Sequence, residues 1–98
     1  MRHEIILSPE ALADLQCLRA HERAIVKDAI ETHLRFDPTR ESRSRIKRLR
    51  GLSRPQFRLR VGDIRVYYDV RGDQVEILGM VPKSLTESWL TEWENERR

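Results

Sequence analysis

A chain of 98 residues can build one modest hydrophobic core, so we expect a single domain over residues 1–98. Hydrophobic residues make up 39% of the chain and charged residues 36%, which excludes a membrane-embedded protein and indicates a charge-rich globular one. The net charge is only +3, but residues 40–65 contain ten Lys and Arg against two acids, Glu41 and Asp63. A local basic patch favours a polyanionic partner such as nucleic acid, and a solvated charged surface is the alternative interpretation.

Cysteine and histidine usage argues against a disulfide or a metal site. Cys17 is the single cysteine, and we expect it to be a small buried hydrophobic side chain. The three histidines are far apart and share no ligand spacing, so no metal is expected. No apolar stretch is long enough for a signal peptide or a membrane span, so we expect no membrane association and a cytoplasmic location.

The first third of the chain predicts a short strand followed by two helices. Residues 2–7 have the composition of a strand, and Ser8 is a suitable N-cap for a helix over about residues 9–19. Apolar residues that recur every 3.6 positions predict a second helix over about residues 22–36, and Asp37-Pro38 ends it. So short a connection predicts an antiparallel helical hairpin.

The second half of the chain predicts a β-meander and a last helix. Residues 39–50 show little apolar period and are interpreted as an exposed basic loop. Three strands joined by short Gly-Asp turns are expected at residues 56–61, 64–71 and 74–81. Residues 84–96 are expected to form a C-terminal helix, with Ser84 and Glu87 as its capping box. The whole order implies an α+β fold: a four-stranded antiparallel sheet with the helical hairpin on one face and a short C-terminal helix.

Two of these strands alternate apolar and basic residues. Because successive strand side chains point to opposite faces, Arg58 and Arg60 share one face, and Arg65 and Tyr67 of the next strand join them. Buried arginines need partners, so this face must be wet or must meet something anionic. We take an anionic partner as the functional hypothesis.

Three motifs now make a family resemblance visible. The segments RLRG (residues 48–51), FRLRV (57–61) and IRVYY (64–68), after a helical pair, resemble the RelE/ParE superfamily of toxins from bacterial type II toxin–antitoxin pairs. The resemblance covers roughly residues 2–90. It implies, for RelE members, entry into the 30S ribosomal A site and cleavage of mRNA there by attack of the ribose 2′-hydroxyl on the adjacent phosphate. ParE members share the fold but poison DNA gyrase, and a small cognate antitoxin neutralises both types.

The resemblance also assigns roles to residues. Arg65 matches the family's characteristic catalytic arginine, Arg58 and Arg60 match two lysines facing the scissile phosphate, and Lys83 falls near a further catalytic arginine. These four are taken as catalytic residues. The nucleic-acid-binding set is expected to comprise Arg45, Lys47, Arg48, Arg50, Tyr67 and Trp89.

One position departs from the family pattern. Trp89 stands where a C-terminal tyrosine or histidine is expected; tryptophan can stack on a base but cannot exchange a proton. Tyr67 and Lys83 are then the titratable candidates, with a structural sheet tyrosine and a solvated strand-end lysine as the alternatives. As a pair, Trp89 and Trp93 are interpreted as core residues that cap the sheet edge rather than as side chains that stack on RNA, and an antitoxin-docking surface is the further alternative.

Three functions remain open at this point. The leading hypothesis is a ribosome-dependent endoribonuclease without a cofactor, which acts on mRNA and is held by its antitoxin in a heteromeric complex. The second is a ParE-type gyrase poison without nuclease activity. The third is a degenerate toxin that only binds its antitoxin.

Overall fold

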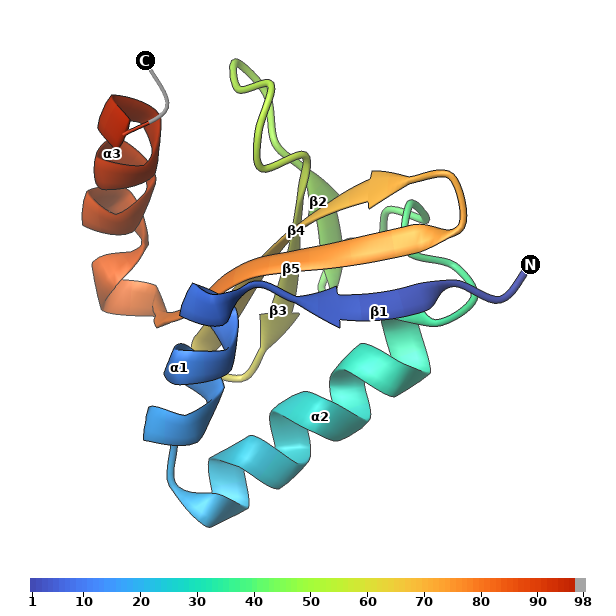
Figure 1. Ribbon diagram of the computed structural model, residues 1–98, viewed down its shortest axis with the longest axis horizontal. Helices are drawn as coiled ribbons and strands as arrows, with labels where there is room; N and C mark the ends of the chain where they lie inside the picture. Colours follow the sequence, from blue (N-terminus) through green and yellow to red (C-terminus); the bar gives the residue numbers. More distant parts are fainter. Residues whose placement is uncertain (97–98) are drawn as a thin grey trace.

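The computed structural model describes residues 1–96, which form one sheet with helices against both faces (Figure 1). The elements in chain order are β1 (Glu4–Leu7), α1 (Pro9–Cys17), α2 (Ala20–Leu34), β2 (Ile46–Arg48), β3 (Phe57–Val61), β4 (Ile64–Arg71), β5 (Gln74–Pro82), the 3₁₀ turn η1 (Lys83–Leu85) and α3 (Thr86–Glu96). The sheet has five strands in the order β1-β5-β4-β3-β2. The α+β class and the β3-β4-β5 meander are as predicted.

The sheet itself differs from the predicted four-stranded antiparallel one. β1 pairs with β5 in parallel, from Glu4 beside Gln74 to Leu7 beside Ile77. The helices α1 and α2 carry the chain across one face to the far edge, so β1 stays beside the last strand and the long connection allows a parallel pair. The fifth strand, β2, lies inside the segment that was expected to be a loop, because Ile46 pairs with Leu59 and is buried in the core.

The two N-terminal helices lie on the same face of the sheet but do not form a close antiparallel pair. Ser8 caps α1 as predicted, since the Ala11 N–H donates to its Oγ at 3.1 Å. Only Leu18 and Arg19 separate the helices, and the extended backbone of these residues makes α1 and α2 diverge in Figure 1. Cys17, expected to be buried, is exposed at the end of α1.

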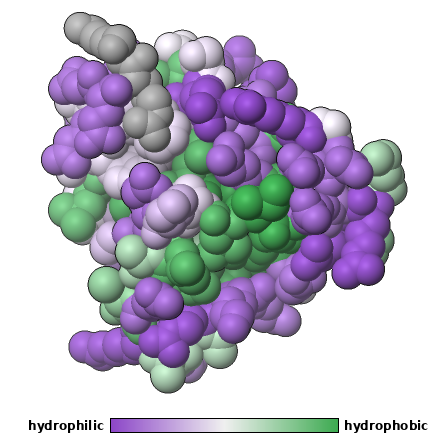
Figure 2. Space-filling view, in the orientation of Figure 1, coloured by the Kyte–Doolittle hydropathy of each residue, from purple (hydrophilic) through white to green (hydrophobic). Residues whose placement is uncertain are grey.

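The core lies between these helices and the sheet. Its buried side chains are Ala11, Leu15, Val26, Ala29, Ile30, Leu34, Ile46, Phe57, Leu59, Val61, Ile64, Val66, Tyr68, Val75, Ile77 and Met80. The Tyr68 hydroxyl donates to the Pro38 carbonyl at 2.6 Å, which fixes the segment after α2 against the sheet. Figure 2 shows hydrophobic residues in the centre of the face that carries the edge strand β1. Ile6 of β1 is an exposed hydrophobic residue.

The C-terminal helix begins differently from the prediction. Ser84 lies inside η1 rather than at an N-cap, and the Thr86 hydroxyl donates to the Lys83 carbonyl at 3.1 Å. The expected capping box of Ser84 and Glu87 is therefore wrong, because the chain makes a 3₁₀ turn directly after β5. No helix within residues 1–96 is long and apolar enough to cross a membrane.

Candidate nucleic-acid interface

The sheet face opposite α1 and α2 carries the arginine cluster, defined as Arg58, Arg60 and Arg65. In the antiparallel register Arg60 lies opposite Arg65, and Arg58 lies opposite Tyr67. The side chains share this face because the apolar residues between them point into the core. The tight turn at Gly62, whose φ of 57° suits glycine, keeps β3 and β4 in that register.

Arg65 is the most enclosed member of the arginine cluster, with 6% of its surface exposed. Its Nη1 donates to the carbonyls of Gly62 at 2.9 Å and Ile64 at 3.3 Å, which fixes the orientation of the guanidinium. Burial lowers the pKa of Arg65, and the positive charges of Arg58 and Arg60 lower it further. An anion placed here would relieve both effects.

Arg58 adds an unsatisfied donor to the same place. Its Nε is buried and has no hydrogen-bond acceptor among residues 1–96. A buried N–H without an acceptor costs about 1–3 kcal/mol. The cost is removed when an oxygen of a bound ligand accepts that hydrogen bond.

Carboxylates of the same sheet face do not neutralise the arginine cluster. Two of them are held by Arg54: its Nε donates to Asp69 at 2.6 Å, and its Nη2 donates to Glu76 at 3.1 Å. Asp69 also accepts from the Gln56 N–H at 2.8 Å. Within residues 1–96 no ion pair reaches Arg58, Arg60 or Arg65.

Two lysines adjoin the arginine cluster. Lys47 on β2 lies opposite Arg58, and this register places both on one face. The Lys83 N–H donates to the Asp63 carbonyl at 2.7 Å, so Lys83 follows β5 beside the turn that holds Arg65. Lys83 is exposed to solvent beside that turn.

Three other basic residues of the expected binding set lie elsewhere. Arg48 follows Lys47 in β2, so its side chain points to the opposite face of the sheet. Its guanidinium carbon lies 5.1 Å from the centroid of the Phe57 ring. Arg50 is exposed in the loop beyond β2. Arg45 precedes β2 at the sheet edge, where its Nη1 donates to the Arg60 carbonyl at 3.5 Å.

Aromatic side chains cover the part of the face next to the arginine cluster. Trp89 of α3 is stacked between Tyr67, at 4.8 Å between ring centroids, and Trp93, at 5.4 Å. Gly79 of β5 lies under Trp89, where a Cβ atom would come within 2.5 Å of the indole ring. In this arrangement Tyr67 is only 2% exposed and Trp89 stacks on protein rather than on a base.

The stack also fixes the protonation state of Tyr67. Burial raises the pKa of its hydroxyl, and a hydrogen bond with Thr86 and the nearby Arg58 only partly oppose this effect. Tyr67 therefore stays protonated at neutral pH and is no general base there. No group of His, Cys, Asp and Glu that could hold a metal ion occurs within residues 1–96.

Two residues that matter to the face were absent from the sequence-based set. In the sequence Arg54 is one more residue of the basic run. In the structure it forms ion pairs with Asp69 and Glu76, which lie far from it in sequence, so its role could not be predicted from the local pattern. Gly79 could have been found, because an isolated glycine inside a strand often marks close approach of another group.

The comparisons with known proteins place this fold. A sequence model of the family described as ParE toxin of type II toxin–antitoxin system, parDE, matches residues 5–81. A comparison with curated proteins gives no match.

Solved structures show the same fold at low sequence identity. The archaeal RelE–RelB complex from Pyrococcus horikoshii OT3 matches with a TM-score of 0.69 and 22% identity, over 85% of this chain and 97% of that chain. The RelB–RelE antitoxin–toxin complex from Methanococcus jannaschii matches with a TM-score of 0.64 and 20% identity, over 86% and 96%. The conserved hypothetical protein HP0894 from Helicobacter pylori matches with a TM-score of 0.54 and 19% identity, over 86% and 97%.

These matches confirm the predicted RelE/ParE resemblance, and the RelE-like fold includes the mixed sheet. Because the family match spans most of its length, the chain belongs to the family of ParE toxins of type II toxin–antitoxin systems.

Proposed function

We propose that this toxin is a ribosome-dependent endoribonuclease that cuts mRNA in the 30S A site and thereby inhibits translation. The single observation that carries the proposal is the arginine cluster, which lies on one sheet face without a carboxylate partner among residues 1–96. A cognate antitoxin is its proposed partner, in line with the family and with the likeness to the RelE chains of two RelB–RelE complexes. The proposed site of action is the cytoplasm, where ribosomes translate.

The proposed reaction needs stabilisation of negative charge on phosphorus. The ribose 2′-oxygen forms a bond to the adjacent phosphorus, the bond from phosphorus to the 5′-oxygen breaks, and one proton moves from the 2′-hydroxyl to solvent or a base while another reaches the leaving oxygen. Arg65, already oriented by two carbonyls, and Arg58, with its unsatisfied Nε, are suited to bind the phosphate oxygens. Donors that are already oriented before the reaction lower the barrier most, because they need not reorganise as negative charge develops.

Proton transfer depends less on this chain. Tyr67 stays protonated because burial raises its pKa, so it serves as a donor at most. Of the two lysines that adjoin the arginine cluster, Lys83 is proposed to face the leaving oxygen, because it follows β5 beside the turn that holds Arg65. Positioning of the RNA by the ribosome supplies the rest of the rate, since alignment alone lowers barriers strongly.

The test is Arg65→Ala, expressed without the antitoxin. Loss of one charge-stabilising donor costs roughly 10²–10³-fold in rate, so growth arrest and A-site cuts, mapped by primer extension on a translated message, should disappear. Arg71→Ala is the matched control, because Arg71 lies on the same strand but is exposed at its far end. Arg65→Lys keeps the charge but loses the planar donor geometry, and it should keep only weak activity.

The proposal fails if wild-type toxin leaves messages intact while growth stops, or if Arg65→Ala cuts them as well as Arg71→Ala does. A ParE-type gyrase poison is the second candidate, and two observations favour it: the family description and the raised pKa of the buried Tyr67, which makes this residue unsuited as a general base. DNA breaks and an SOS response with intact messages would identify it. A fully expressed wild type without any growth effect would instead indicate a chain that only binds its antitoxin.

A further inference from the structure

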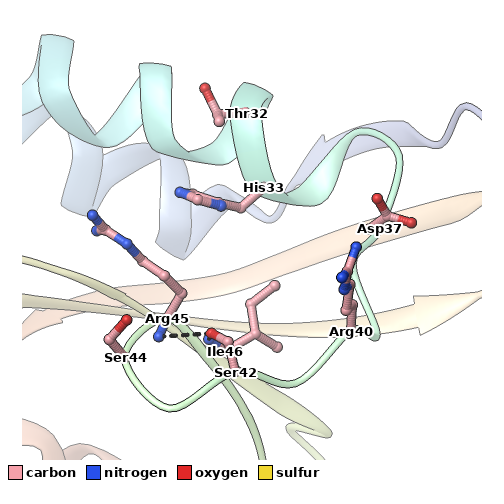
Figure 3. A pocket seen from close by; sticks show the side chains of 8 residues that line it. All are labelled: Thr32, His33, Asp37, Arg40, Ser42, Ser44, Arg45 and Ile46. Atoms are coloured by element: carbon pink, nitrogen blue, oxygen red, sulfur yellow. Dashed lines mark hydrogen bonds between the residues drawn. The ribbon is translucent and has the colours of Figure 1, made fainter.

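A cleft with several polar lining residues lies between the end of α2 and the start of β2 (Figure 3). It encloses about 400 Å³, which falls within the range of pockets that bind small ligands. The end of α2 forms one wall, the loop between α2 and β2 forms the other, and Ile46 lies at the floor. The lining residues are Thr32, His33, Asp37, Arg40, Ser42, Ser44, Arg45 and Ile46.

The cleft offers an excess of donors. Arg40 and Arg45 pair with no carboxylate of residues 1–96, and Asp37 is the single acid in the lining. In Figure 3 the Arg45 side chain extends toward His33 on α2. Guanidinium, imidazole and hydroxyl groups around one space suit an anion with several acceptor oxygens, which is the chemistry of a phosphate group.

The loop is held in place by its own hydrogen bonds. The Ser42 Oγ accepts from the backbone N–H of Arg45 at 3.0 Å and of Ile46 at 3.4 Å, and the Ser42 N–H donates to the Ile46 carbonyl at 3.0 Å. The Ser42 hydroxyl hydrogen is left to donate to something else. These hydrogen bonds fix the backbone of Arg45 before a ligand binds. Less backbone entropy is therefore lost when the Arg45 side chain binds an anion.

Arg45 connects the cleft to the arginine cluster. The Arg60 N–H donates to the Arg45 carbonyl at 2.8 Å, and the Arg45 guanidinium donates to the Arg60 carbonyl. Lys47, two residues further along β2, lies opposite Arg58. Positive charge is thus continuous from the cleft, across the β2 edge, to the opposite face of the sheet.

We propose that this cleft is a second phosphate subsite, which binds a backbone phosphate of the RNA strand whose scissile phosphate lies on the arginine cluster. The inference rests on the proposed RNA substrate and extends it by fixing the path of the strand around the β2 edge. Arg40 and Arg45 are binding residues in this proposal, and they take no part in bond cleavage.

The experiment measures RNA binding rather than cleavage. Fluorescence anisotropy of a labelled 12-nucleotide RNA is followed against NaCl concentration for wild type, for Arg40→Gln with Arg45→Gln, and for the control Arg43→Gln with Arg71→Gln. The control removes the same charge from exposed positions outside the cleft lining. The cleft variant should bind at least about tenfold more weakly than the control, because loss of even one charged hydrogen bond to a phosphate contributes a factor of that order.

Two further readouts separate a local subsite from a general loss of charge. The slope of log Kd against log salt should fall by about 0.7 for one lost phosphate contact on a single strand. A trinucleotide, too short to reach both places, should bind the cleft variant and the control alike. Arg40→Lys with Arg45→Lys should recover most of the 12-nucleotide affinity.

Equal affinity of the cleft variant and the control for the 12-nucleotide RNA overturns the proposal. So does unchanged RNA binding with weaker antitoxin binding, which would assign the cleft to an acidic peptide. If wild-type toxin cuts no message but the cleft variant still binds RNA more weakly than the control, the cleft proposal holds and the nuclease proposal alone fails.

Discussion

Gly79→Ala tests how α3 is held on the sheet. An alanine Cβ at this position would lie 2.5 Å from Cζ2, 2.8 Å from Cε2 and 2.9 Å from Nε1 of Trp89. Non-bonded carbons prefer about 3.5–4.0 Å, so the indole must move by about 1 Å. Tyr67 and Trp93 both stack on Trp89, so a movement of the indole by this amount disturbs both ring pairs.

The magnitude follows from those contacts. Overpacking of a tight site costs about 1–3 kcal/mol, and disturbing two aromatic pairs removes about 0.5–1.5 kcal/mol for each pair. We expect a loss of about 2 kcal/mol in the free energy of unfolding, which lowers Tm by roughly 10 °C in a domain of this size. Trp89 and Trp93 are the only tryptophans, so their fluorescence reports on α3 while far-UV circular dichroism reports on the whole fold.

A double-mutant cycle supplies the control. In a Trp89→Ala background, Gly79→Ala should cost almost nothing, because the ring that it would strike is gone. Urea unfolding of the four proteins gives the coupling energy between the two positions. The reasoning is refuted if Gly79→Ala costs the same in both backgrounds.

Two further predictions concern polar groups, the buried Tyr68 hydroxyl and the half-buried Asp14 carboxyl. Tyr68→Phe should lower the free energy of unfolding by about 1–2 kcal/mol in urea titrations, because it leaves the Pro38 carbonyl without its buried donor. Burial raises the pKa of Asp14, the neighbouring Glu10 adds to this, and a hydrogen bond from the Met80 N–H opposes it. A raised pKa means that the folded protein loses stability as pH rises through it, so Asp14→Asn, which keeps an acceptor, should be more stable than wild type at pH 7. Unfolding experiments repeated at about pH 3, where the carboxyl is protonated in both states, should show that this gain has disappeared.

The arginine cluster could be predicted because it depends only on short-range rules. Alternation along β3 and β4 fixes which side chains share a face, and the two-residue turn at Gly62 and Asp63 fixes the register between the strands. Arg60 opposite Arg65 follows from these two facts without knowledge of the rest of the fold.

The positions of β1 and β2 depend on long-range pairing and were not predictable in the same way. An apolar run such as Ile5 to Leu7 indicates a strand but contains no information on its neighbour or direction, which here is β5 and parallel. β2 has a single buried residue, Ile46, so it shows no alternation that could distinguish it from a loop.

The cover over the sheet face was predicted only in part. The spacing of Trp89 and Trp93 placed both on one side of a helix, and a core position for them was one of the alternatives. Which surface they meet depends on the 3₁₀ turn at Lys83–Leu85, which sets the direction of α3 after β5. This turn follows Pro82 directly and stands where the capping box was expected.

The charges of the sheet face are divided between its two ends. At one end Arg54 holds Asp69 and Glu76, so these carboxylates neither repel a polyanion strongly nor reach the arginine cluster. At the other end burial and the positive charges of Arg58 and Arg60 lower the pKa of Arg65, and no acid within residues 1–96 forms an ion pair with these three arginines. Since the stack of Tyr67, Trp89 and Trp93 adjoins the cluster, the proposed RNA strand is expected to approach from the β2 side. That direction leads past Lys47 to Arg45, which is why the cleft beyond the β2 edge is the natural continuation of the proposed path.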